Sequence, residues 1–224
     1  LLDRGVDIFQ EGVNRTKSGE EPMVKIRTDA RVLRRHYYRR RLRKIEVLKV
    51  LVENNLCPYL GDEQLDARRY KKQYPLAEEF MQWLRSSDSN NPYTDRFKSL
   101  TEALNLNKIE DRYTLGRALY HLSQRRGFLS NRKDNESNDD GTVKGAITKL
   151  DKDMLAEGCT YLGEFYYKLF VAGKKIRTGD AYGYAGRIAH YEKEFNAICE
   201  KQGLSDDLRT ALHRAIFFQR PLKS

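Results

Sequence analysis

The sequence predicts an all-α fold, in which a long arginine-rich helix packs on an elongated multi-helix domain and a short strand or extended segment lies near the N-terminus. Residues 29–53 contain neither Gly nor Pro and are rich in Arg, Leu and Lys, which are good helix formers. From residue 56 onward, apolar side chains recur at the spacing of helices. Charged residues make up 33% of the chain and its mean hydropathy is -0.77, which favours large solvated or ligand-facing surfaces over a large core.

The N-terminal part of the chain is predicted to hold a strand, a linker and the long helix. Residues 5–9 are the candidate strand, and residues 14–22 are predicted to be a polar linker. The helix is expected over residues 28–54, because Thr28 or Asp29 can cap its start and Asn54-Asn55 can end it. Its second half carries apolar side chains all round and is predicted to be buried in protein: Ile45, Val47, Leu48, Val50, Leu51 and Val52.

The first half of the helix concentrates the charge of the whole chain. Residues 31–49 contain seven Arg, two Lys and one acid, Glu46, and so carry a net charge of +8 out of the chain's +10. Such concentration predicts a dedicated contact with a polyanion. At roughly 100° per residue the basic side chains fall on three sides of the helix: Arg31, Arg35 and Arg39, then Arg40 and Lys44, then Arg34 and Arg41.

Other interpretations of this helix fit less well. An ordinary solvated helix would pair its cations with acids three or four residues away, and this one has almost none. A leucine-zipper arm fails because the heptad from Leu42 continues to Lys49, and a membrane-surface helix would need one clean apolar face. The excess of Arg over Lys favours phosphate recognition. His36, Tyr37 and Tyr38 could stack on bases, although packing is the more conservative interpretation.

The rest of the chain is predicted to form further helices. Apolar stripes cover residues 76–84, after Pro75, and residues 115–122, before Gly127. Additional helices are expected over residues 143–156, 161–172, 185–202 and 205–219, the last with Ser205 as its N-cap. Residues 130–141 are polar and predicted to be a mobile loop, and residues 179–186 a loop whose tyrosines either contact a ligand or pack.

Several classes of function find no support. Cys57, Cys159 and Cys199 are scattered, which indicates reduced thiols of a cytosolic protein, mostly in its core. The four histidines lack metal-ligand spacing, and no catalytic motif is present, so neither a metal site nor a catalytic residue is expected. No apolar run reaches the roughly 18 residues of a membrane span and no signal peptide opens the chain, so we expect a soluble protein that is not exported and has no membrane partner.

A second basic cluster comprises Arg125, Arg126, Arg132 and Lys133 at a predicted helix end and in the loop beyond. Cations at this position can complement the helix dipole. They can also form a phosphate-binding loop, in which Gly127 would allow close backbone approach. The residues alone leave both interpretations open.

Several segments together resemble the type II CRISPR-associated RNA-guided DNA endonucleases. Residues 29–53 are similar to their Arg-rich bridge helix. Three stretches are similar to the family's recognition lobe: Asn91-Pro-Tyr93 with Arg96, residues 115–122, and residues 124–128 with 130–132. Residues 5–9 resemble the end of the first RuvC-like nuclease segment, and residues 218–224 the exit from the lobe. These segments occur along the chain in the same order as in the family.

The resemblance implies a fragment of such an endonuclease, with three parts. Residues 1–27 would be the tail of a RuvC-like segment plus a linker, residues 28–55 the bridge helix, and residues 56–224 an α-helical recognition domain. The nuclease motifs, the HNH module and the PAM-reading domain have no counterpart in the sequence. The fragment is therefore expected to be non-catalytic and to need no cofactor, while the parent would be a metal-dependent endonuclease using Mg²⁺ at nuclease sites elsewhere.

The implied function is nucleic-acid binding in CRISPR antiviral defence in a bacterial cytoplasm. The implied partners are the guide RNA (crRNA with tracrRNA) and target DNA through the RNA–DNA heteroduplex, read by phosphates and 2′-hydroxyls. Two alternatives remain: a stand-alone helical RNA-binding protein, and an interaction module whose basic helix docks an acidic partner such as an anti-CRISPR protein. The expected RNA contacts are Arg31, Arg34, Arg35, Arg39, Arg40, Arg41, Arg43, Lys44, Arg125, Arg126 and Arg132.

Overall fold

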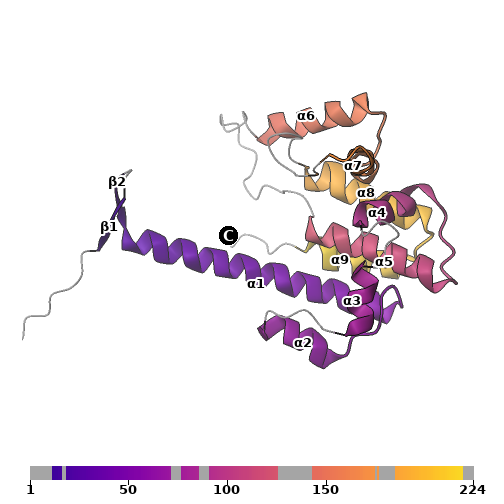
Figure 1. Cartoon of the computed structure of the whole chain (residues 1–224), viewed down its shortest axis with the longest axis horizontal. Helices are drawn as coiled ribbons and strands as arrows, with labels where there is room; N and C mark the ends of the chain where they lie inside the picture. The colour runs from indigo at the N-terminus through magenta and orange to yellow at the C-terminus, as the bar shows by residue number, and fades with distance from the viewer. Residues whose placement is uncertain are drawn as a thin grey trace, which may run out of the picture. The chain divides into compact units, whose positions relative to one another are not determined.

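A computed structural model describes residues 12–16, 19–71, 77–85, 91–125, 143–174, 176 and 185–218. In these residues the fold is all-α, as predicted: α-helices, one π-helix and a two-stranded hairpin (Figure 1). Contacts divide the chain into two compact units, Leu1–Arg41 and Leu42–Ser224. Helix α1, Met23–Glu53, runs through the boundary between them. The predicted strand at residues 5–9 and the predicted loop at residues 130–141 lie outside the described residues.

The first unit contains a hairpin where a polar linker was predicted. Strand β1, Val13–Thr16, pairs antiparallel with β2, Gly19–Pro22, with Arg15 opposite Glu20. The linker prediction was wrong because neither strand contributes to the core found among the described residues, so the sequence shows no apolar alternation here. The pairing is held by backbone hydrogen bonds and by an exposed ion pair of 3.4 Å between Arg15 and Glu20.

Helix α1 begins earlier than predicted and ends where predicted. It starts at Met23, directly after Pro22, so the expected caps Thr28 and Asp29 lie inside the helix. At the other end, Asn55 takes a left-handed conformation with φ of 55°, and the Leu56 N–H donates to the Leu51 carbonyl at 2.8 Å. This left-handed residue caps the helix after Glu53, where the Asn54-Asn55 pair predicted its end.

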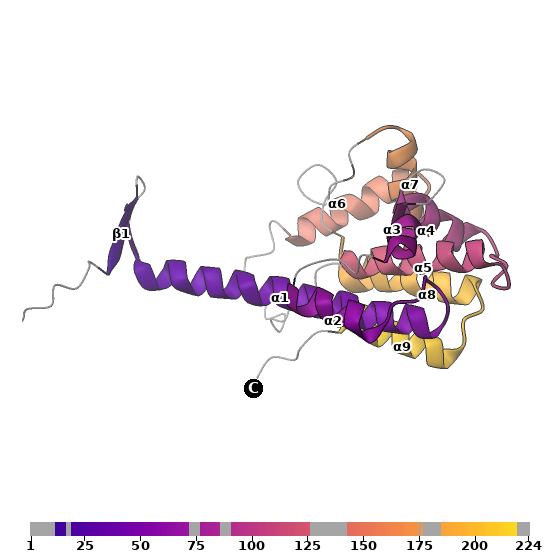
Figure 2. The same ribbon diagram turned by 60° about the horizontal axis from the view of Figure 1, so that its bottom comes forward.

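The second unit is built around helix α4, Pro92–Thr101. Helix α4 packs against α5 (Ile109–Gln124), α7 (Leu162–Val171) and α8 (Lys193–Lys201), and α5 packs in turn against α9 (Asp206–Phe217) (Figure 2). The remaining described helices are α2 (Asp62–Lys71), α3 (Glu78–Arg85) and α6 (Val143–Ala156). The prediction that the end of α1 is buried is confirmed: Ile45, Val47, Leu48 and Leu51 belong to the core, and Val50 and Val52 pack against it.

Local signals placed several of these helices correctly. Helix α6 has the predicted bounds, and α9 starts with Ser205, whose hydroxyl accepts from the Leu208 N–H at 3.4 Å. Helix α4 has Asn91 as N-cap and Pro92 in its first turn, a favourable combination. Cys57, Cys159 and Cys199 are free and buried, in agreement with their expected core positions. Burial raises the pKa of the Cys57 and Cys199 thiols to about 12.

One predicted helix is divided in two. Residues 185–202 form a π-helix, η2 (Arg187–Glu192), followed by α8. The His190 ring holds the start of this helix: its Nδ1 accepts from the Gly186 N–H at 2.9 Å, and its Nε2 lies 2.9 Å from Asp151 Oδ1. The Gly186 carbonyl accepts from the Tyr191 N–H at 3.4 Å, the wider hydrogen bond of a π-helix. An apolar pattern cannot distinguish it from an α-helix.

Candidate nucleic-acid interface

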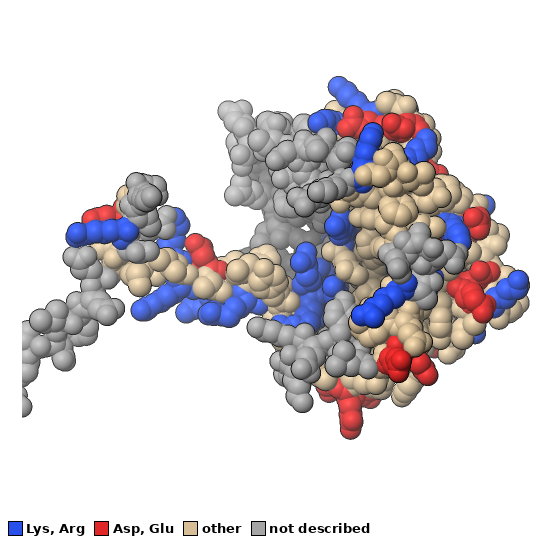
Figure 3. All heavy atoms as spheres, in the orientation of Figure 1, with Lys and Arg blue, Asp and Glu red and all other residues tan. Residues whose placement is uncertain are grey.

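Five arginines on the first part of α1 are exposed: Arg31, Arg34, Arg35, Arg39 and Arg40. Within the described part of the chain none of them has a hydrogen bond or an ion pair with another residue. Lys and Arg side chains gather along α1 in Figure 3. Cations of one sign placed this close repel one another unless an anion lies between them. This arrangement therefore favours binding of a polyanion.

Two tyrosines lie among these arginines and are also exposed. Tyr37 is 55% exposed and Tyr38 39%, so neither ring belongs to the core of the described residues. Their neighbours in this unit, residues 31–40, are also exposed without exception. Both rings are available for stacking on bases or sugars.

Three further predicted contacts meet at the C-terminal end of α5, within the second unit. Arg43 Nε donates to the backbone oxygen of Ser123 at 3.5 Å, and Lys44 Nζ donates to Gln124 Oε1 at 3.4 Å. Arg125 follows at once and is exposed. We call Arg43, Lys44 and Arg125 the α5-end cluster. The last carbonyls of a helix carry partial negative charge, so these cations stabilise the helix end while their outer faces can meet an anion.

The other predicted basic residues have different surroundings. Arg41 is half-buried and belongs to the first unit. Arg126 and Arg132 lie outside the described residues, as does Gly127, so the predicted phosphate-binding loop is not described.

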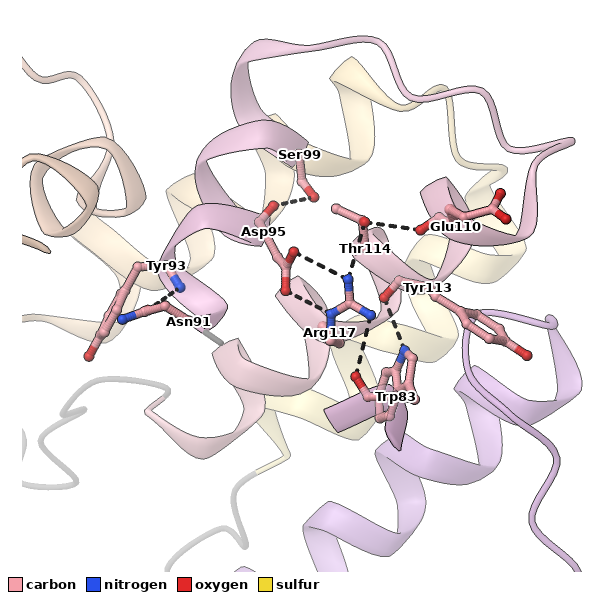
Figure 4. Close-up of polar contacts among 9 residues, drawn as sticks. All are labelled: Trp83, Asn91, Tyr93, Asp95, Ser99, Glu110, Tyr113, Thr114 and Arg117. Carbon is pink, nitrogen blue, oxygen red and sulfur yellow. Dashed lines mark hydrogen bonds and ion pairs between the residues drawn. The ribbon is translucent and has the colours of Figure 1, made fainter. Parts of the chain in front are cut away.

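Tyr93 of α4 fixes the position of Arg125. Arg125 Nη1 donates to the Tyr93 hydroxyl at 3.3 Å. The Tyr93 ring contacts His121 edge-on, with ring centroids 5.0 Å apart, and Tyr166 with centroids 5.7 Å apart. The Asn91 side chain accepts from the Tyr93 N–H at 2.9 Å (Figure 4). The tyrosine is therefore held from three sides and presents its hydroxyl to the arginine.

A buried ion pair begins at Arg96, one turn after Tyr93 on α4. Arg96 Nε and Nη2 donate to the two carboxylate oxygens of Glu194 at 2.7 and 2.5 Å, and both side chains are 0% exposed. Burial disfavours the charge of Arg96, but the carboxylate of Glu194 and its hydrogen bonds raise the pKa of Arg96 above the ordinary value. The pair links α4 to α8 and so has a structural role.

His121 is neutral in this environment. Burial, together with the charges of Arg96 and Arg125, lowers the pKa of His121 well below the ordinary value. Arg96 Nη1 lies 3.5 Å from His121 Nδ1. Because a guanidinium can only donate, Nδ1 is the acceptor and the ring proton lies on Nε2.

A second ion pair joins α4 to α5 and α3. Arg117 Nε donates to Asp95 Oδ2 at 2.8 Å, and Arg117 Nη1 donates to the backbone oxygen of Trp83 at 3.4 Å (Figure 4). Trp83 Nε1 donates to the Tyr113 carbonyl at 3.2 Å.

Between α3, α4 and α5 lies a cavity of about 230 Å³, whose lining includes Leu84, Pro92, Asp95, Arg117, His121 and Gln124.

Sequence reasoning missed Tyr93, His121, Gln124 and the cavity as parts of the site. Tyr93 was noted only within a family-like motif, and nothing in the sequence pairs it with Arg125.

No group of three or more His, Cys, Asp or Glu suited to a metal occurs among the described residues. The same residues contain no helix long and apolar enough to cross a membrane.

Two crystal structures of Campylobacter jejuni Cas9 in complex with sgRNA and target DNA are similar to this chain. The structure with the AGAAACA PAM has a TM-score of 0.57 and 19% identity, and the match covers 88% of this chain and 25% of the Cas9 chain. The structure with the AGAAACC PAM has a TM-score of 0.63 and 19% identity, and the match covers 89% of this chain and 25% of the Cas9 chain. This chain thus spans about a quarter of the length of those proteins and shares the fold of that quarter. No family model matches the chain, and no curated protein matches it in sequence.

Proposed function

We propose that this chain is the bridge-helix and recognition-lobe part of an RNA-guided DNA endonuclease of CRISPR antiviral defence, and that it binds guide RNA and the RNA–DNA heteroduplex. The observation that carries the proposal is the set of five exposed arginines on α1 without partners among the described residues. The likeness to a quarter of Cas9, whose two structures hold sgRNA and target DNA, supports RNA as the polyanion.

In this proposal the chain has three parts. Residues 28–55 are the bridge helix, residues 56–224 the recognition domain, and residues 1–27 the tail of a RuvC-like segment with a linker. The chain itself binds and does not cut, and cleavage with Mg²⁺ is assigned to other parts of the parent protein. The proposed RNA contacts are Arg31, Arg34, Arg35, Arg39, Arg40, Arg41, Arg43, Lys44, Arg125, Arg126 and Arg132.

The mode of recognition follows from the side chains. Guanidinium groups bind phosphate oxygens in a bidentate manner, and contacts to phosphate carry no base preference. A continuous helix with arginines on three sides can follow the phosphates of a structured RNA, and the exposed Tyr37 and Tyr38 can add stacking. Affinity should therefore depend on RNA shape and on salt more than on sequence.

The test is a salt titration of binding to three nucleic acids: a Cas9-type single guide RNA, an unrelated RNA of equal length, and a DNA duplex. We expect tightest binding to the guide RNA. The variant with Arg34, Arg35, Arg39 and Arg41 replaced by Ala should reduce the slope of log K against log salt by about three, since each lost phosphate contact removes roughly 0.7–0.9.

The matched control removes four exposed lysines of the second unit: Lys108, Lys152, Lys174 and Lys201 to Ala. It makes the same change in net charge and should leave the slope near that of the wild type. Equal loss in both variants would indicate unspecific attraction by net charge. If the guide RNA binds no better than the other nucleic acids and an acidic protein competes for the α1 arginines, the helix is a protein-docking surface instead.

A further inference from the structure

The cavity between α3, α4 and α5 adjoins the α5-end cluster. Gln124 belongs to both, because it lines the cavity while its Oε1 accepts from Lys44 Nζ at 3.4 Å. Arg125 directly follows Gln124. Arg43 donates a hydrogen bond to the backbone oxygen of Ser123, the residue before Gln124. An RNA whose phosphates contact these cations would pass the cavity at close range.

The size and walls of the cavity suit a small planar ring. Its volume of about 230 Å³ is below the roughly 300–1,000 Å³ of pockets for drug-sized ligands. Leu84 and Pro92 supply apolar wall, and the charges of Asp95 and Arg117 are bonded to each other at 2.8 Å. The cavity therefore offers neither a bare carboxylate nor room for a large ligand.

Two residues that line this space each keep a side-chain hydrogen-bond donor without a partner among the described residues. One is the Nε2–H of neutral His121, whose Nδ1 is occupied by Arg96. The other is the side-chain amide of Gln124, whose oxygen alone is bonded. Two such donors match a ligand edge that carries a carbonyl oxygen or a ring nitrogen.

We propose that this cavity receives one unstacked base of the bound RNA, while the phosphates beside that base contact Arg43, Lys44 and Arg125. Proteins that recognise an RNA sequence do so mainly through bases that leave the stack and form hydrogen bonds by their edges. The proposal rests on the proposed function, since it needs RNA at the α5-end cluster. It adds a base-recognition site to a surface otherwise expected to read only phosphates.

The experiment compares two probes on the full chain at one salt concentration: single-stranded oligo(U), and an abasic ribose-phosphate oligomer of equal length. Both carry the same phosphates. We expect wild type to bind oligo(U) at least about fivefold more tightly, the lower bound of one base contact. Oligo(A), oligo(C) and oligo(G) then show which base edge is preferred.

Variants separate the base contact from the phosphate contact. Gln124→Met removes the amide at nearly constant volume, and Leu84→Phe fills the cavity; each should lower the abasic-to-oligo(U) ratio of Kd by at least about fivefold, while any stacking on Tyr37 and Tyr38 remains. Lys44→Met is the control, because Gln124→Met also removes the partner of Lys44. It should weaken both probes alike and leave the ratio unchanged.

The only tryptophan gives an independent readout. Trp83 lies on α3 beside Leu84, and its ring centroid is 6.1 Å from that of Tyr120, another lining residue. Oligo(U) should change the Trp83 fluorescence and the abasic oligomer should not. A wild-type ratio of one, or a ratio that Gln124→Met and Leu84→Phe leave unchanged, with binding still weakened by Lys44→Met, would overturn the base site and leave the proposed function standing. No binding of any RNA, including the guide RNA, would overturn the proposed function itself.

Discussion

Gly116 of α5 lies directly against the backbone carbonyl of Leu56, just beyond the end of α1. A Cβ at Gly116 would lie 1.7 Å from the Leu56 oxygen and 2.8 Å from its carbonyl carbon. Only glycine permits this approach, and the neighbour is backbone, which cannot rotate away. The contact brings the buried end of α1 onto α5, the same pair of helices that forms the α5-end cluster.

The first prediction follows from this contact. Gly116→Ala should destabilise the chain by about 2–3 kcal/mol, because overpacking against backbone outweighs the ~1 kcal/mol that alanine gains in a helix. Denaturant unfolding measures the change. Gly61→Ala is the control, since its nearest neighbour is a Tyr59 ring carbon at 4.0 Å, and it should be close to neutral. Equal effects of the two substitutions would contradict the argument.

The second prediction concerns the buried pair of Arg96 and Glu194. Glu194→Gln leaves the guanidinium without its charge partner in a site that is 0% exposed, and should cost roughly 3–5 kcal/mol. Replacing both residues together, by Met and Leu, should recover much of that loss, since no buried charge then remains.

An exposed pair provides the comparison for this experiment. Glu46 and Lys49 are 59% and 45% exposed and lie 3.6 Å apart. Glu46→Gln should change the unfolding free energy by less than about 1 kcal/mol. A double variant no more stable than Glu194→Gln would show that shape, rather than charge pairing, sets the cost.

The third prediction is a dependence of stability on pH. The pKa of His121 is lowered well below its ordinary value in the fold by burial and by Arg96 and Arg125. Below about pH 6.5 the unfolded chain therefore binds a proton at this residue that the folded chain does not, and acid favours unfolding. His121→Asn retains an acceptor for Arg96 but cannot titrate. It should reduce the slope of unfolding free energy against pH by up to about 1.4 kcal/mol per pH unit.

Chemical unfolding at a series of pH values between neutral and mildly acidic gives these slopes. Parallel curves for His121→Asn and wild type would mean that other groups cause the acid sensitivity.

Properties that depend on neighbours in sequence were predictable. The basic half of α1, its apolar end, the asparagine pair that ends it and the Ser205 cap each rest on residues within a few positions of one another. The exposed arginines were identifiable because no acid lies within reach along the helix. These features follow from helix geometry and local hydrogen bonding.

Contacts between distant segments were not predictable from the sequence. Arg43 meets Ser123 across 80 positions and Arg96 meets Glu194 across 98. At the start of the π-helix, His190 contacts Asp151, which lies 39 positions away. The hairpin at residues 13–22 is held mainly by backbone groups, which every sequence possesses. The cavity exists only because α3, α4 and α5 converge.

The fourth prediction separates the α5-end cluster from the general charge of α1. Arg43 and Lys49 lie on the same helix, but only Arg43 bonds the end of α5, while Lys49 pairs with Glu46. Arg43→Gln should reduce the salt slope of guide-RNA binding by roughly 0.7–0.9, the loss of one phosphate contact. Lys49→Gln removes the same charge and should leave the slope unchanged. Circular dichroism of both variants checks that α1 remains helical. If the two substitutions flatten the slope equally, the cluster has no special part in RNA binding and the helix acts only through its total charge.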